Sequence, residues 1–157
     1  MNSIVCATRA GEGSRAVQQA AITLAKQTGR QLVFLYIIES RVYEALEEPM
    51  RPIVRAELYW LAKTLLRIAG NRAKEADLQP SLIIREGNVR DEISEVVKNV
   101  GASCLLLGAP RHRKANTFGE DAIIDFAKSI QQATGVNVQI EWPKEAAAYV
   151  FSRAAIE

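Results

Sequence analysis

The sequence has few cysteines, a single histidine and little net charge, and this argues against several classes of function. The 157 residues include 2 cysteines and 1 histidine, and the formal net charge is +2. Cys6 and Cys104 form no C-x-x-C pair and have no zinc-ligand spacing with His112, so we expect no metal site. We predict two buried, reduced thiols, with a disulfide between neighbouring strands as the alternative. A charge this small gives no general attraction to nucleic acid, so we expect no nucleic-acid partner.

Long apolar stretches are missing as well. No segment reaches the roughly 18 consecutive apolar residues of a transmembrane helix. The first residues, MNSIVCATRAG, become polar too soon for a secretory signal. We therefore expect no membrane insertion and a cytoplasmic protein. A length of 157 residues fits one main domain. We expect it over residues 1–142, followed by a C-terminal extension over residues 143–157 that is helical.

The apolar residues that are present recur with alternating strand and helix periods. Short apolar runs predict strands at residues 3–8, 31–38, 82–85, 104–107 and 136–141. Helical spacing predicts the intervening helices at residues 14–28, 56–76, 88–100 and 121–134. Residues 39–55 show no clear period, and we expect a long connection with at most a short helical turn. The alternation predicts an α/β fold built on a parallel, doubly wound sheet.

Two of these segments support finer predictions. In residues 56–76 the spacing predicts one buried face, made of Leu58, Leu61, Ala62, Leu65, Ile68 and Ala69. Of the adjacent Tyr59 and Trp60, we expect one in the core and one at the surface. In residues 136–141 the apolar Val136, Val138 and Ile140 alternate with polar residues. That period indicates a half-exposed strand, at a sheet edge or at an interface.

Residues 103–120, SCLLLGAPRHRKANTFGE, join a buried strand to a basic loop. The strand ends at Gly108, and the loop then carries Arg111, His112, Arg113 and Lys114. Open α/β sheets bind ligands at the C-terminal ends of their strands, so this loop is the main candidate site. Its basic side chains could bind a phosphate, and an arginine can do so through two parallel hydrogen bonds. In the alternative interpretation they are solvated charges balanced by the nearby carboxylates of Glu12, Glu120 and Asp121.

The sequence resembles the universal stress protein family from residue 3 to about residue 141. The resemblance is carried by SIVCATRAGEGS at the start, QLVFLYI as second strand, EGNVRDEI before the third helix, and LLLGAP before the basic loop. It implies a five-stranded sheet in the order 3-2-1-4-5, of the Rossmann-like, adenine nucleotide alpha hydrolase-like type. It also implies a homodimer through the last strand, residues 136–141, and in one branch of the family an ATP or AMP site.

The ATP-binding branch has an Asp at the end of the first strand and G-x2-G-x9-G-[ST] after the fourth. Here Arg9 replaces that Asp, Gly108 matches the first glycine, and Arg111 stands at the second. Asp121 falls at the third glycine, which Gly119 could replace if the loop is shorter. The resemblance and the basic loop together give the candidate ligand-binding residues, which are Thr8, Arg9, Tyr36, Gly108, Arg111, His112, Arg113, Lys114 and Gly119.

Residues 108–113, GAPRHR, are also similar to the stress-protein-like domain of potassium-sensing histidine kinases. Some of those domains bind cyclic di-AMP. Of their binding pattern only Tyr36 agrees in this sequence, so we do not transfer that ligand.

These features predict a non-enzymatic regulatory or stress-response protein. It would bind a nucleotide or another phosphate compound at a basic crevice formed by Arg9 and residues 108–114. No G-x-S-x-G, Walker or G-x-G-x-x-G motif is present. The first alternative is weak nucleotide hydrolysis, but Arg9 stands where the family has its metal-holding carboxylate. The second is a ligand-free interaction module that docks through residues 39–55 and 144–157.

Overall fold

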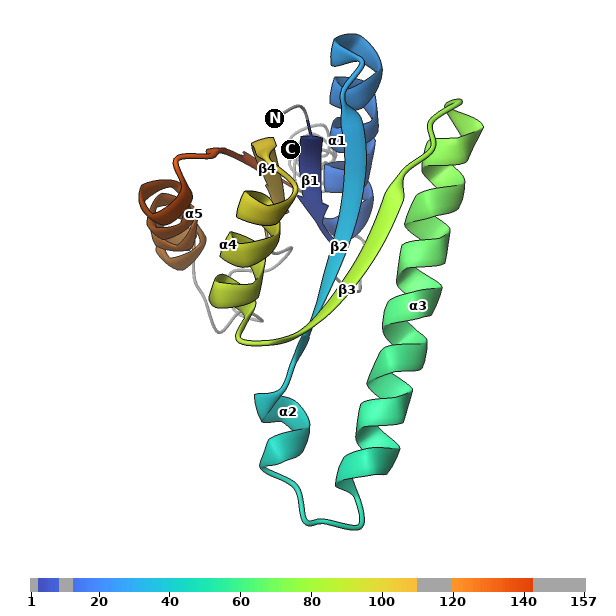
Figure 1. The fold of residues 1–157 in the computed structure, drawn as a ribbon, viewed down its shortest axis with the longest axis vertical. Coiled ribbons are helices and arrows are strands. Elements are labelled where there is room, and N and C mark those ends of the chain that lie inside the picture. The colour runs from blue at the N-terminus through green and yellow to red at the C-terminus, as the bar shows by residue number, and fades with distance from the viewer. Residues whose placement is uncertain (1–2, 9–12, 110–119, 143–157) are drawn as a thin grey trace, which may run out of the picture.

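The fold is a parallel sheet covered by helices on both faces. A computed structural model describes residues 3–8, 13–109 and 120–142. Helices α1 (Gly13–Thr28) and α3 (Arg51–Glu75) cover one face of the sheet, and α4 (Val89–Asn99) and α5 (Glu120–Thr134) cover the other (Figure 1). The predicted α/β, doubly wound architecture is therefore confirmed.

In the part of the chain that the structure describes, the sheet contains five strands in the order β3-β2-β1-β4-β5, all parallel. They are β1 (Ser3–Ala7), β2 (Gln31–Glu39), β3 (Ser81–Gly87), β4 (Ala102–Gly108) and β5 (Asn137–Glu141). This is the order that the family resemblance implied. β1 and β4 pair directly, with Ala7 opposite Leu107, although 100 residues separate them in the chain. The winding reverses between these two strands, so their C-terminal ends form the switch point where such sheets bind ligands.

The central strands are buried on both faces, as their continuous apolar runs predict. In β2, Leu32 and Phe34 pack with α1 and α3, whereas Val33 and Leu35 pack with α4 and α5. Side chains alternate between faces along a strand, so a strand without polar residues requires cover on both sides. This burial fixes the register of the strands and the position of their ends.

The segment predicted as a long connection is more regular than expected. β2 continues to Glu39, the short helix α2 (Arg41–Glu44) follows, and α3 already begins at Arg51. Pro52 lies in the first turn of α3, where a missing N–H does not interrupt the helical hydrogen bonds. Glutamates and prolines obscured the helical period in the sequence.

The buried face of α3 differs from the predicted one. Leu66 is only 2% exposed, whereas Ile68, predicted to point inward, is 43% exposed. Small residues decide the contact, because α3 lies on the sheet through Ala62, Ala69 and Ala73 together with Leu66. Trp60 is the expected surface aromatic, at 69% exposure. Tyr59 is only half-buried, so the expectation of a core aromatic was wrong.

The remaining predictions about the scaffold have mixed outcomes. Among the described strands β5 pairs with β4 alone and forms an edge of the sheet, which is one of the two positions that the alternating pattern predicted. Cys6 and Cys104 are buried free thiols, not a disulfide, and burial raises the pKa of both thiols.

None of the helices in the described part of the chain could cross a membrane. The predicted helix in residues 143–157 lies outside the described residues.

Candidate functional site

A cavity of about 670 Å³ opens at the C-terminal edge of the sheet. The ends of three strands contribute to it: Ala7 of β1 with Thr8 directly after it, residues 35–39 from β2, and Leu107 and Gly108 from β4. Its volume lies in the range of small-molecule sites in proteins. The cavity therefore occupies the switch point of the sheet, where the topology favours ligand binding.

Thr8 is a fixed part of this cavity. It follows β1 directly and is 4% exposed. Its backbone N–H donates to the carbonyl of Leu35 at 2.8 Å, and its hydroxyl lies 3.5 Å from the same oxygen. The backbone bond extends the β1–β2 pairing by one residue and holds the end of β1 against β2. The chain leaves the sheet at this point toward Arg9.

Three of the predicted ligand-binding residues lie in the described part of the chain, and all three line the cavity. These are Thr8, Tyr36 and Gly108. Tyr36 is half-buried, and burial raises the pKa of its hydroxyl. The other six, Arg9, Arg111, His112, Arg113, Lys114 and Gly119, lie outside the described residues. The structure thus brings together the strand ends that precede the two basic segments, and the basic crevice itself stays a prediction.

The first turn of α4 forms a second wall of the cavity. Asn88 is its N-cap, since its side-chain oxygen accepts a hydrogen bond from the backbone N–H of Asp91 at 3.2 Å. Arg90 and Asp91 both line the cavity, and the Arg90 guanidinium lies 5.7 Å from the centre of the Phe126 ring on α5. This wall therefore combines a cation, a carboxylate and the positive end of a helix dipole.

The third wall comes from a projecting segment, residues 40–59, which we call the arm. It contains α2, the following turn and the first part of α3, and it extends beyond the C-terminal ends of the strands (Figure 1). Arg41, Val42 and Leu58 of the arm line the cavity. Arg41 also forms an exposed ion pair with Glu39 at the end of β2. The arm was not expected to contribute to the site.

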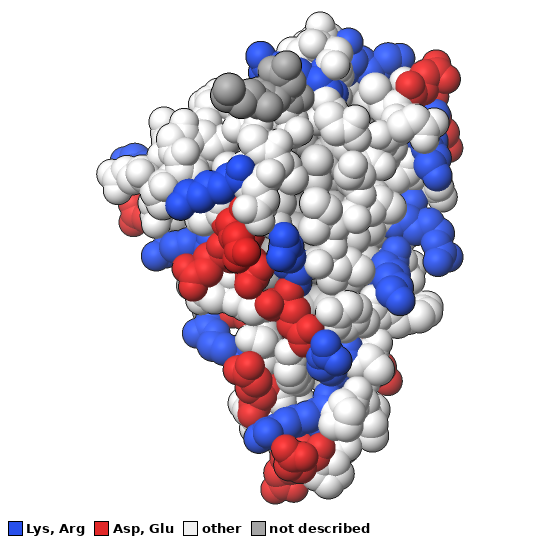
Figure 2. All heavy atoms as spheres, viewed as in Figure 1, with Lys and Arg blue, Asp and Glu red and all other residues white. Residues whose placement is uncertain are grey.

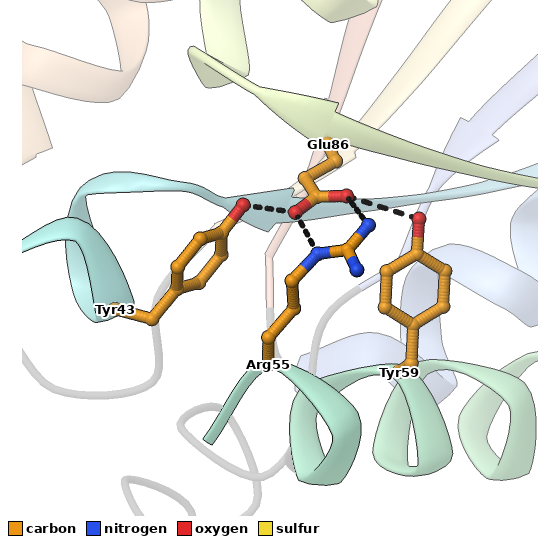
Figure 3. Close-up of polar contacts among 4 residues, drawn as sticks. All are labelled: Tyr43, Arg55, Tyr59 and Glu86. Atoms are coloured by element: carbon orange, nitrogen blue, oxygen red, sulfur yellow. Dashed lines mark hydrogen bonds and ion pairs between the residues drawn. The ribbon is translucent and has the colours of Figure 1, made fainter. Parts of the chain in front are cut away.

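A polar cluster at Glu86 joins the arm to β3 (Figure 3). Arg55 Nε and Nη2 donate to the two carboxylate oxygens of Glu86, at 2.7 and 2.9 Å. The Tyr59 hydroxyl donates to Oε2 at 3.1 Å, and the Tyr43 hydroxyl donates to Oε1. The Arg55 guanidinium also lies 5.1 Å from the centre of the Tyr59 ring. One carboxylate therefore accepts hydrogen bonds from both helices of the arm.

The cluster keeps Glu86 ionised. Its pKa is lowered from 4.5 to about 2, chiefly by the hydrogen bonds from Arg55 and further by those from the two tyrosines, while partial burial acts in the opposite direction. The carboxylate in turn raises the pKa of Tyr43 and Tyr59. The sequence did not predict this cluster. Its only indication of such contacts is a glutamate at the end of a predicted strand, with tyrosines far upstream.

The charged surface of the molecule shows no large patch of one sign on the face drawn in Figure 2. Acidic and basic side chains alternate over its lower part, where α2 and the start of α3 lie. Within residues 3–8, 13–109 and 120–142, no group of three or more His, Cys, Asp or Glu side chains could hold a metal ion. The described walls therefore offer mixed charge and apolar contact.

Comparison with known proteins identifies the family. The model of the universal stress protein family matches residues 1–130. A universal stress protein family member from Burkholderia pseudomallei has a TM-score of 0.69 and 15% identity, over 88% of this chain and 94% of that chain. A universal stress protein solved with cAMP has a TM-score of 0.62 and 19% identity, over 90% of this chain and 97% of that chain.

A third structure, the universal stress protein from Archaeoglobus fulgidus in complex with dAMP, has a TM-score of 0.61 and 13% identity, over 90% of this chain and 98% of that chain. At these identities the three structures show the fold alone. A comparison with curated proteins found no match. The family model covers more than half of the sequence, and the chain therefore belongs to the universal stress protein family.

Proposed function

We propose that this protein is a cytoplasmic, non-enzymatic regulatory protein of the stress response that binds a nucleotide or a related phosphate compound. The observation that carries the proposal is the cavity of about 670 Å³ at the switch point, with Thr8, Tyr36 and Gly108 in its lining. Two relatives of the same fold were solved with adenine nucleotides, cAMP and dAMP. ATP and AMP are therefore the first ligands to test here.

The basic residues would bind the phosphate groups. Arg9 follows Thr8 directly, and Arg111 comes shortly after Gly108, so both segments start from residues that line one cavity. Arginine binds phosphate oxygens by two parallel hydrogen bonds, which favours a phosphate compound over an uncharged ligand. Arg90, on the α4 wall, adds a further cation within the described lining.

A non-enzymatic role is supported by the carboxylates of the cavity. Glu39 is paired with Arg41, and Asp91 lies in the first turn of α4. Arg9 stands where the ATP-binding branch has an Asp, so a metal-bound phosphate lacks its usual protein ligand there. The buried free thiols of Cys6 and Cys104 support a reducing compartment such as the cytoplasm.

A homodimer through β5 is part of this proposal. β5 is an edge strand, and Val138 and Ile140 on it are only partly buried within the chain. A second β5 would cover both the apolar side chains and the free backbone groups of the edge.

Isothermal titration calorimetry of the 157-residue chain with ATP, AMP, cAMP and cyclic dinucleotides tests the binding proposal. We expect Arg9→Ala and Arg111→Ala each to weaken binding about tenfold or more, since a hydrogen bond to a charged group contributes about 1.5–3 kcal/mol. Arg67→Ala is the matched control, because Arg67 is exposed on α3 and does not line the cavity. No heat with any ligand would leave only the interaction-module alternative.

A further inference from the structure

The arm, residues 40–59, is a wall of the cavity that contributes no buried residue to the hydrophobic core. None of its residues is buried, and the first buried residue of α3 is Ala62. α2 likewise has no buried residue. Hydrophobic burial is the main force that positions helices on a sheet. Partly buried apolar residues and the continuity of α3 contribute to the position of the arm, and polar contacts must supply much of the rest.

Those polar contacts converge on the end of β3. Glu86 accepts hydrogen bonds from Tyr43 on α2 and from Arg55 and Tyr59 on α3. One backbone bond lies beside them, from the N–H of Ser40 to the carbonyl of Gly87 at 3.3 Å. The other ion pairs of the arm, Arg51 with Glu48 and Arg41 with Glu39, do not reach β3. Among the described side chains, Glu86 is thus the shared anchor of both helices.

Glu86 itself does not line the cavity, but two of its hydrogen-bond partners are adjacent in sequence to residues that do. Val42 of the lining is adjacent to Tyr43, and Leu58 of the lining is adjacent to Tyr59. Figure 3 shows the two tyrosines and Arg55 reaching Glu86 from the arm. A displacement of the arm from Glu86 would therefore also displace the apolar wall that faces a ligand.

We propose that Glu86 is a positioning residue that holds the arm as a wall of the ligand cavity, so that ligand affinity depends on a carboxylate outside the cavity. The effect on ligand affinity rests on the proposed nucleotide binding, whereas the holding of the arm by Glu86 does not depend on any ligand. The chemistry is a charge-assisted, two-point ion pair reinforced by two hydroxyl donors, which is strong and directional. Ligand binding would in turn hold the arm more firmly in place, since the coupling is reciprocal.

The test combines amide hydrogen exchange with AMP binding on the full chain. In Glu86→Ala we expect exchange in residues 40–59 to accelerate about tenfold or more, the effect of losing a charge-assisted contact, and exchange in β1 and β4 to stay unchanged. AMP affinity should fall by a similar factor. Tyr59→Phe removes one donor only and should produce the same changes to a smaller degree, which covers the case in which Glu86→Ala does not fold.

The control is Arg51→Ala, which removes an ion pair with Glu48 and a hydrogen bond to the Leu46 carbonyl, both within the arm, and leaves the contact with β3 intact. We expect it to leave exchange at Tyr43 and Tyr59, and AMP affinity, as in the unaltered protein. A double change, Arg55→Glu with Glu86→Arg, restores the pair in reverse and should recover affinity and slow exchange relative to either single change.

The outcomes separate the two proposals. If hydrogen exchange in residues 40–59 is unchanged in both Glu86→Ala and Tyr59→Phe, the anchoring role is overturned, regardless of the measured AMP affinity. Faster exchange with unchanged AMP affinity would overturn the link between the arm and the site. If the unaltered protein binds no AMP, the proposed function and that link both fail, and the exchange data alone still decide whether Glu86 holds the arm.

Discussion

Arg55 and Glu86 form a two-point ion pair, at 2.7 and 2.9 Å, that joins α3 to β3 across 31 residues of chain. The pair lies at the end of the sheet where the cavity opens, and it connects the arm to the strand that leads into α4. Two sides of the cavity, the arm and the first turn of α4, therefore meet at one short segment, residues 86–88.

Stability should fall in acid because of Glu86. Its folded-state pKa is lowered from 4.5 to about 2, so the ionised carboxylate stabilises the fold above the unfolded pKa, and this contribution disappears as the pH falls toward about 2. We expect the urea unfolding free energy to decrease between about pH 5 and pH 2 more steeply in the unaltered protein than in Glu86→Gln. Parallel curves for the two proteins would contradict this assignment.

The buried face of α3 can be tested with two leucine-sized residues. Leu66→Ala should destabilise the protein by about 2–5 kcal/mol, because it leaves a cavity in the core. Ile68→Ala should change the unfolding free energy by no more than about 0.5 kcal/mol, as for other surface positions. Chemical denaturation measures both. Equal losses would mean that the predicted inward position of Ile68 was right after all.

Gly87, between Glu86 and the cap residue Asn88, should not tolerate a side chain. Its φ is +150°, and an added Cβ would lie 2.9 Å from Oε1 of Glu92. We expect Gly87→Ala to cost about 1–3 kcal/mol from the backbone alone, and more where Glu92 cannot move. Gly29→Ala is the comparison, because Gly29 has φ +66° but open space around it. Thermal unfolding of the two variants should show the larger loss for Gly87→Ala.

A charge on β5 should separate the proposed dimer. Val138→Glu places a carboxylate on a partly buried position of the edge strand, and light scattering should then report monomers. Gln139→Glu adds the same charge to the exposed neighbouring position and should leave the mass unchanged. Circular dichroism confirms that both variants fold. A dimer that persists in Val138→Glu would remove β5 as the interface.

Much of the scaffold could be predicted because buried strands and helix faces require apolar residues at regular spacings in the sequence. In the run QLVFLYII every residue after Gln31 is apolar, as a strand covered on both faces requires, and the run forms most of β2. The alternation from Val136 onward indicated a half-exposed strand at an edge or an interface, and β5 does form an edge of the sheet. The strand order, in contrast, came from the family resemblance, since periodicity does not state which strands are neighbours.

The arm and its anchor could not be predicted, for physical reasons that are specific to them. No residue of the arm is buried, and residues 40–55 lack the apolar period that predicted the helix from residue 56 onward. The donors to Glu86 lie 27–43 residues upstream, and a polar contact over such a separation leaves no local pattern. On α3, most of the buried residues are alanine or glycine, and their small side chains indicated a buried face less clearly than Ile68 did.

The candidate site was predicted in part. Thr8, Tyr36 and Gly108 do line one cavity, because parallel strands place their C-terminal ends at the same edge. The walls contributed by Arg41, Leu58 and Arg90 were not anticipated, since each belongs to a helix whose approach to the strand ends depends on tertiary packing. The crevice formed by Arg9 and Arg111 lies outside the described residues and stays a prediction.

The central claim, that a nucleotide binds at the ends of β1 and β4, is tested most directly by an NMR titration of the labelled protein with AMP. The account predicts that amide shifts concentrate at Thr8, Tyr36 and Gly108 and at Arg41 and Arg90, while Gly29 at the opposite end of the sheet does not respond. Shifts that cluster around Gly29, or no shifts at saturating AMP and ATP, would contradict it.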